Sequence, residues 1–360
     1  MKAKKTILLF IPLIVFIALI STLDAVQIAN SAERPGAAWH SSSPSRIDAE
    51  NVEFAGQVGE RANAVAVAEN YAYTADAYNE ELHVINISSP ASPAEIGKCN
   101  TAGGNPQAVA VSGKYAYVTT QWGGLRVINV ANPVTPTETG FFETPGHGAG
   151  VTVSGSNAYV VDSDYGLYIV DVTNPTTPTE IAYFIPKGIA TDVAVSGNYA
   201  YLTDFSYGGL QIIDVSNPAK PTETGYYDVP GSAVSVAVDN NLAFVTGSAG
   251  LRIIDISDPA KPTEVGFYDT VGYAKDVAIS GNYAFVADGE EGLRVINVID
   301  PSSTEEVGFY DTLGDALSVD VVGNLAYVAD EDGGLIILRY TGSIPEGSYR
   351  IFLPGVLGMK

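Results

Sequence analysis

The chain of 360 residues has a net charge of -23 and contains 37 Gly, 20 Pro, 21 Tyr and a single Cys. So acidic a chain repels phosphate backbones and anionic lipid headgroups, which excludes nucleic acid as a partner. The lone Cys99 excludes an intramolecular disulfide framework, so the fold must depend on its hydrophobic core.

The N-terminal region is typical of an exported protein. In residues 1–32, three lysines precede an uncharged apolar run at 7–20, and small residues at 29–31 fit a cleavage site. We therefore expect an extracellular or cell-envelope location. A retained anchor is the alternative, although the run is short for a membrane span of about 20 residues. Residues 33–51 are polar and unpatterned, which predicts a tether.

From residue 52 to 342 the sequence repeats. Each copy contains four short β-type runs, for example 192–197, 199–204, 210–216 and 221–228, and no helical pattern lies between them. The copies recur at intervals of 41 to 44 residues, and repeats with a period of about 20 to 50 residues form blades or solenoid turns. The pattern predicts an all-β fold, a seven-bladed β-propeller with four antiparallel strands per blade. The shared alanines that align the copies are Ala72, Ala116, Ala158, Ala200, Ala243, Ala284 and Ala326.

The two ends of the repeat region predict how the ring closes. The seventh copy ends at LIILRY (335–340) and lacks its outer strand, whereas VEFAGQVGE (52–60) precedes the first copy and resembles one. We expect residues 52–60 to complete the last blade. A closed ring leaves no terminal blade with a bare apolar face, and we expect it to be monomeric.

The third strand of each copy carries a family resemblance. LYIVDVTNP (167–175), LQIIDVSNP (210–218), LRIIDISDP (251–259) and LRVINVANP (125–133) resemble the LVIVD repeat of exported and cell-surface bacterial and archaeal proteins. The resemblance implies a β-propeller at the cell surface and brings no catalytic motif with it. The seventh copy departs from the pattern with Arg339 in the Asp/Asn position, which affects a local turn and not the ring.

A short polar residue closes the third strand of most copies, just before a turn that contains proline. Such a side chain can accept a hydrogen bond from the following loop, and proline presets φ, so we interpret these residues as structural. At the start of the first strands the residues are small, and only Asp192 and Asp276 place a carboxylate there. The strand-closing residues are Asn86, Asn129, Asp171, Asp214, Asp255 and Asn297.

The copies differ most in the loop between the second and third strands, on what we call the variable face, which also carries the links between blades. Aromatic residues gather in copies one to four and acidic residues in copies six and seven. Aromatic side chains on a rigid scaffold can stack on sugar rings or bind apolar peptide side chains. The alternative is that they pack between blades. The candidate ligand-binding residues are Tyr78, Trp122, Tyr165, Phe205, Tyr207, Glu290, Glu291 and Asp332.

We therefore expect a non-enzymatic module that binds a protein, peptide or glycan at the cell envelope, with a structural or adhesive scaffold as the alternative. A hydrolase or lyase that uses His147 with Asp162 or Asp164 is a weaker hypothesis. No cofactor is expected. Calcium is a weaker candidate at Asp162 and Asp164 and at Asp330 and Asp332, because neither acidic loop continues to a distal Glu.

Residues 343–360 follow the ring and form a separate tail with an apolar segment. This tail could pack on a blade edge, pair with a partner strand, or assist attachment to the envelope.

Overall fold

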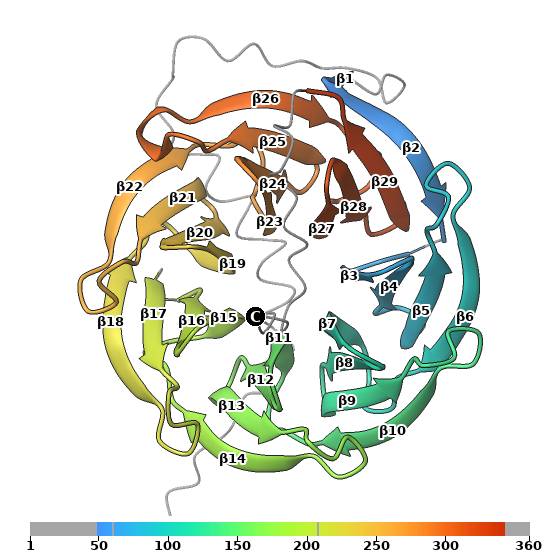
Figure 1. Ribbon diagram of the computed structural model, residues 1–360, viewed down its shortest axis with the longest axis vertical. Coiled ribbons are helices and arrows are strands. Elements are labelled where there is room, and N and C mark those ends of the chain that lie inside the picture. Colours follow the sequence, from blue (N-terminus) through green and yellow to red (C-terminus); the bar gives the residue numbers. More distant parts are fainter. Residues whose placement is uncertain (1–48, 60, 207–208, 343–360) are drawn as a thin grey trace, which may run out of the picture. The chain divides into compact units, whose positions relative to one another are not determined.

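The computed structural model describes residues 49–59, 61–206 and 209–342, and within these ranges the chain forms seven antiparallel sheets around one axis (Figure 1). These sheets are the blades of a propeller, so the predicted fold is confirmed. The predicted export signal, most of the predicted tether and the predicted C-terminal tail lie outside the described residues. In the described part of the chain, no helix has the length and apolar character needed to cross a membrane.

Blades one to four each contain four strands that are consecutive in the sequence. Blade one consists of β3 (Ala64–Ala68), β4 (Tyr71–Asp76), β5 (Glu81–Asn86) and β6 (Ala94–Asn100). Blade two consists of β7 (Pro106–Ser112), β8 (Tyr115–Thr120), β9 (Gly124–Asn129) and β10 (Thr137–Phe142). Blade three consists of β11 (Gly148–Ser154), β12 (Asn157–Asp162), β13 (Gly166–Asp171) and β14 (Thr179–Phe184). Blade four consists of β15 (Ala190–Ser196), β16 (Tyr199–Asp204), β17 (Gly209–Asp214) and β18 (Thr222–Asp228).

Blades five to seven continue the series, and the last two also receive strands from the N-terminal side. Blade five consists of β19 (Ala233–Asp239), β20 (Leu242–Gly247), β21 (Gly250–Asp255) and β22 (Thr263–Tyr268). Blade six contains β23 (Asp276–Ser280), β24 (Tyr283–Ala287), β25 (Leu293–Asn297) and β26 (Glu305–Tyr310), with the 3-10 helix η1 (Pro301–Ser303) before β26. Blade seven contains β27 (Ser318–Val322), β28 (Leu325–Ala329) and β29 (Leu335–Tyr340).

An N-terminal strand closes the ring, as predicted. Strand β2 (Val52–Val58) pairs antiparallel with β29 and becomes the outer strand of blade seven. The preceding strand β1 (Ala49–Glu50) belongs to the segment expected to be a tether, but it pairs with β26 and gives blade six a fifth strand. The paired segment therefore begins slightly before the predicted boundary.

The hydrophobic core lies between the blades rather than at the ring axis. Each of the core clusters formed by the described residues joins side chains of two neighbouring blades, and together they connect every adjacent pair. The alternation of side chains along each strand sends one set to each neighbour. The outer strand also provides room for the next blade. A Cβ atom at Gly97 or Gly266 would collide with the carbonyl oxygen of Pro133 or Pro301, respectively.

The strand-closing Asp and Asn residues have the predicted structural role. Asp171 Oδ1 accepts a hydrogen bond from Thr173 N at 2.8 Å, and Asn86 Oδ1 accepts one from Ser88 N at 2.9 Å. The Thr173 hydroxyl and backbone N–H hold the pKa of Asp171 below its usual value. These side chains are therefore part of the turn and are not free to take part in chemistry.

Candidate functional site

The loops between second and third strands lie beside the links that enter the same blades. Backbone hydrogen bonds join them, from Gln121 N to Asn105 O and from Ser163 N to His147 O, both at 2.8 Å. These hydrogen bonds hold the loops of the variable face against the rigid blades. The backbone positions from which the loop side chains project are therefore fixed.

Three of the predicted aromatic residues are strongly exposed. The exposed fractions are 75% for Tyr78, 63% for Trp122 and 51% for Tyr165. Phe205 is half-buried, and Tyr207 lies outside the described residues. The exposure of three large apolar groups leaves them available to a ligand.

Trp122 is held against a histidine from the next link. The ring centroids of Trp122 and His147 lie 4.3 Å apart, and His147 Nδ1 forms a short contact with Asp164 Oδ2. The backbone N–H of His147 also donates to Asp164 Oδ2 at 3.2 Å. The structure thus joins the predicted His147 and Asp164 into a pair across blades two and three, with Trp122 packed on the imidazole.

Tyr78, in a loop of blade one, is connected through Arg61 to an acidic residue of blade seven. The Arg61 guanidinium carbon lies 4.8 Å from the centroid of the Tyr78 ring, and Arg61 forms an ion pair with Asp332. Two of the candidate ligand-binding residues, Tyr78 and Asp332, are therefore bridged by one arginine that the sequence analysis did not consider.

The acidic loops of blades six and seven expose fewer carboxylates than their sequences suggest. Asp288 and Asp330 are buried and accept hydrogen bonds from Gly272 N at 2.8 Å and Gly314 N at 2.9 Å. Burial raises the pKa of both carboxyls. Glu290 and Asp332 remain exposed, whereas Glu291 Oε2 accepts a 3.1 Å hydrogen bond from Arg294 Nη2. The buried carboxylates of Asp288 and Asp330 therefore join their loops to the neighbouring links and are not exposed to a ligand.

Three of the four carboxylates considered for calcium accept hydrogen bonds from backbone N–H groups, and the fourth, Asp332, is paired with Arg61. Asp162 Oδ2 accepts from Gly146 N at 2.7 Å, and its Oδ1 accepts from Asp164 N at 3.0 Å and Tyr165 N at 3.1 Å. Within residues 49–59, 61–206 and 209–342, no three His, Cys, Asp or Glu side chains are arranged to hold a metal ion.

Besides Asp239 at the end of β19, three carboxyls lie near the start of the innermost strands. Asp276 Oδ1 accepts from Ser235 Oγ at 2.7 Å and its Oδ2 from Ser318 Oγ at 2.9 Å, while Asp192 Oδ2 lies 2.8 Å from the same Ser235 Oγ. Asp320 Oδ2 accepts from Val67 N at 2.7 Å in the neighbouring blade. The sequence analysis named Asp192 and Asp276 but missed Asp320, which lies two residues farther along its strand.

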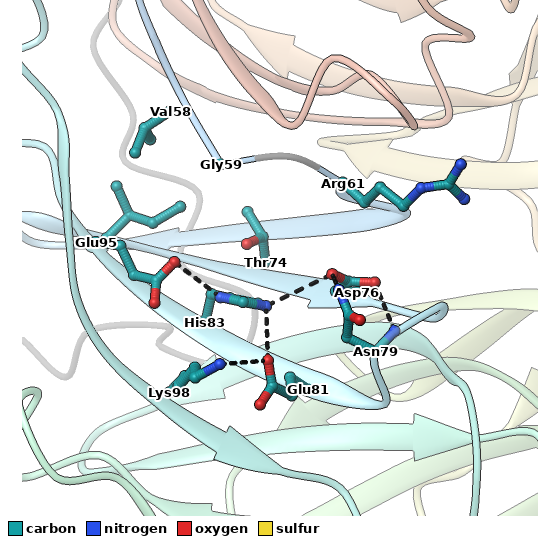
Figure 2. Close-up of a pocket in the computed structure, with 11 residues that line it drawn as sticks. Val58, Gly59, Arg61, Thr74, Asp76, Asn79, Glu81, His83, Glu95 and Lys98 are labelled. Carbon is teal, nitrogen blue, oxygen red and sulfur yellow. Dashed lines mark hydrogen bonds and ion pairs between the residues drawn. The ribbon is translucent and has the colours of Figure 1, made fainter.

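A pocket of about 420 Å³ lies on blade one, beside the end of β2 (Figure 2). His83 is at its centre, with Nδ1 3.0 Å from Glu95 Oε2 and Nε2 3.7 Å from both Asp76 Oδ2 and Glu81 Oε2. Lys98 Nζ donates to Glu81 Oε2 at 2.9 Å. The sequence analysis assigned His83 no role, although Glu81 stands where the six other copies have glycine.

Comparison with known proteins supports the repeat architecture. The LVIVD repeat matches residues 59–101, 103–144, 145–184, 187–229, 230–270, 271–312 and 313–338. Among solved structures, the computationally designed Ika8 protein is similar at a TM-score of 0.58 and 9% identity, over 79% of this chain and 98% of that one. At this identity the likeness shows a shared fold alone. Among curated proteins there is no significant match.

Proposed function

Because the chain belongs to the LVIVD-repeat family, we propose that its propeller is an exported binding module that recognises a glycan, peptide or other envelope partner through the variable face. The Lys-led apolar run at the N-terminus supports export. The family assigns no activity by itself, so the proposal depends on the residues of this face.

The main observation behind the proposal is the exposed side chain of Trp122, which packs against the imidazole of His147. An indole that is 63% exposed yet fixed by a ring contact at 4.3 Å presents a preoriented flat surface. Such a surface stacks on a sugar ring or an apolar side chain with little loss of side-chain entropy. Tyr165 on the neighbouring blade extends the same face, with about half of its surface exposed.

Tryptophan fluorescence tests this proposal directly. In a Trp39→Phe variant, Trp122 is the remaining tryptophan, so its emission reports contact with added cell-wall polysaccharide, peptidoglycan fragments or peptides. We expect one of these probes to shift the emission and to lose at least tenfold in affinity with Trp122→Ala. If none of the probes changes the emission or binds by calorimetry, binding at this face is refuted and the scaffold alternative is favoured.

The His147–Asp164 pair favours a second candidate, a hydrolase or lyase. A carboxylate that contacts Nδ1 orients the imidazole and leaves Nε2 for proton transfer. Incubation of the polysaccharide and peptide probes with the wild-type chain and with His147→Ala tests it. Cleavage by the wild type that the variant lacks would support catalysis, and intact probes in both samples would contradict it.

A further inference from the structure

Three blades contain a buried arginine at the place that His83 occupies in blade one. Each arginine lies on the third strand and pairs across the ladder with a phenylalanine of the fourth, and its guanidinium lies over that ring. The side chains of these arginines are 7%, 10% and 7% exposed. The pairs are Arg126 with Phe141, Arg252 with Phe267 and Arg294 with Phe309, at 4.9, 4.6 and 4.9 Å from Cζ to the ring centroid.

Carboxylates surround these internal guanidinium groups. Arg126 Nη1 lies 3.7 Å from Glu138 Oε1, on the outer strand. Arg294 approaches Asp288 Oδ2 at 4.0 Å, at the loop after the second strand, and binds Asp311 Oδ1 at 2.8 Å. The site is therefore built for a planar cation, because a guanidinium can donate to several carboxylate oxygens at once.

Blade one keeps the carboxylates but has no arginine. Glu95 pairs with Ile85 as Glu138 pairs with Ile128. Asp76, at the end of the second strand, corresponds to Asp288 of blade six, whereas blades two and five have Thr120 and Gly247 at this position. Glu81 adds a further carboxylate. The arginine is replaced by His83 and the phenylalanine by Lys98, two residues that face each other across the ladder. The shorter imidazole leaves the cavity of about 420 Å³.

The central groups of this cavity are hydrogen-bond acceptors. When His83 Nδ1–H donates to Glu95, Nε2 carries a lone pair, and this buried atom has no hydrogen-bond partner among the described residues. Asp76 Oδ2 and Glu81 Oε2 lie 3.7 Å from it, and Figure 2 shows both carboxylates directed toward the imidazole. The lining carboxylates of Asp76, Glu81 and Glu95 outnumber the cavity's two permanent cations, Arg61 and Lys98, of which Lys98 already donates to Glu81. The convergent acceptors therefore favour a ligand with several donors and a positive charge.

We propose that this pocket binds the guanidinium group of an arginine side chain presented by a partner protein or peptide. The guanidinium would occupy in trans the place that Arg126, Arg252 and Arg294 fill in their own blades. A net charge of -23 favours the approach of a basic partner. This inference goes beyond the proposed function, because it concerns a different site and a different chemistry from the aromatic variable face.

Calorimetric titration of the full chain with a capped Gly-Gly-Arg-Gly-Gly peptide tests the proposal. The matched probe is the same peptide with citrulline, which keeps the shape of arginine but lacks its charge. We expect the arginine peptide to bind at least tenfold more tightly than the citrulline peptide. Equal affinity for the two peptides, or no binding of either, would overturn the proposal.

Free L-arginine distinguishes the two sources of a guanidinium. Tighter binding of the peptide than of free arginine supports a protein partner, because the peptide backbone adds contacts beyond the cavity. Equal binding would assign the pocket to the free amino acid and overturn the partner assignment.

Two variants locate the binding in this pocket. His83→Arg should fill the cavity with an internal guanidinium and abolish peptide binding, without lowering the melting temperature. Glu95→Gln keeps an acceptor for His83 but removes a charge, and should weaken binding at least tenfold. Its matched control is Glu180→Gln, an exposed residue at the same strand position in blade three, which should bind normally. Unchanged binding by both pocket variants would refute the site.

A third substitution separates this inference from the proposed function. Trp122→Ala should leave arginine-peptide binding unchanged, because the indole belongs to blade two and does not line the pocket. Loss of peptide binding in Trp122→Ala with retention in Glu95→Gln would show that the peptide occupies the variable face, and would overturn the pocket assignment.

Discussion

Replacing Asp276 on the innermost strands by serine should change how the stability of the ring depends on pH. Serine already occupies the same strand position in blades five and seven, as Ser235 and Ser318, so the substitution brings no foreign group to the ring axis. Desolvation raises the pKa of Asp276 to about 6, and the charge of Asp192 adds to the rise. The folded protein therefore binds a proton here more tightly than the unfolded chain does.

The sign and size of the effect follow from linkage. An unfolded Asp titrates near pH 3.9, so the favourable contribution of protonated Asp276 is complete below that pH and is lost as the pH rises through about 6. A difference of about 2 pKa units corresponds to about 3 kcal/mol. Because the side chain keeps some contact with solvent, this value is an upper limit, and we expect about 1 to 3 kcal/mol.

Urea denaturation at a series of pH values from about 4 to about 8 measures the effect. The free energy of unfolding of the wild type minus that of Asp276→Ser should fall across this range, because only the wild type must bury the charge. The difference between two chains cancels the general effect of the acidic surface. Asp214→Asn is the control, since hydrogen bonds from Ser216 lower the pKa of this carboxyl, so the corresponding difference should not fall as the pH rises.

A difference that stays constant or rises with pH would refute this reasoning. It would mean that the pKa of Asp276 is not raised in the folded protein, and that both Asp276 and Asp192 are charged there at neutral pH. The hydroxyl of Ser235 would then need to satisfy two charged carboxylates with a single proton, which the geometry does not provide for.

Three further predictions follow from the architecture. Removing residues 49–59 should expose the edge of β29, lower the melting temperature and cause aggregation, measured by calorimetry and light scattering; unchanged behaviour would contradict closure by β2. Gly266→Ala should destabilise the protein by about 1 to 3 kcal/mol in urea, because a Cβ collides with Pro301 O, whereas Gly155→Ala has open space and only its positive φ to oppose it. Fractionation of the source cells should find the chain outside the cytoplasm, and a cytoplasmic pool with intact Met1 would exclude export.

The repeats made the fold predictable because most copies contain the same local signals. A hairpin glycine, a strand-closing Asp171 or Asn86 and a following proline are short-range features, and their recurrence in most of the seven copies reinforces them. The missing outer strand of the seventh copy likewise predicted the pairing of residues 52–58. These inferences needed only the order of residues along the chain.

The site residues were less predictable because their surroundings come from other blades and links. Asp330 looks like a surface acid in its loop, yet Gly314 N, sixteen residues earlier, binds it in the interior. The pocket on blade one depends on the cross-strand pairing of His83 with Lys98. An alignment of the copies could have found it, because Glu81 and His83 both depart from the residues at their positions in the other repeats.

The pairing of β2 with β29 also sets the order in which the ring can be assembled during synthesis. Blades one to five hold all four of their strands in one continuous stretch, so each can form soon after it leaves the ribosome. Strand β2 is made before all of them, but its partner emerges only after the other six blades. Until then the nascent chain carries an unpaired strand that could bind to another copy. A ribosome that stalls before residue 335 would therefore release six nearly complete blades and no closed ring.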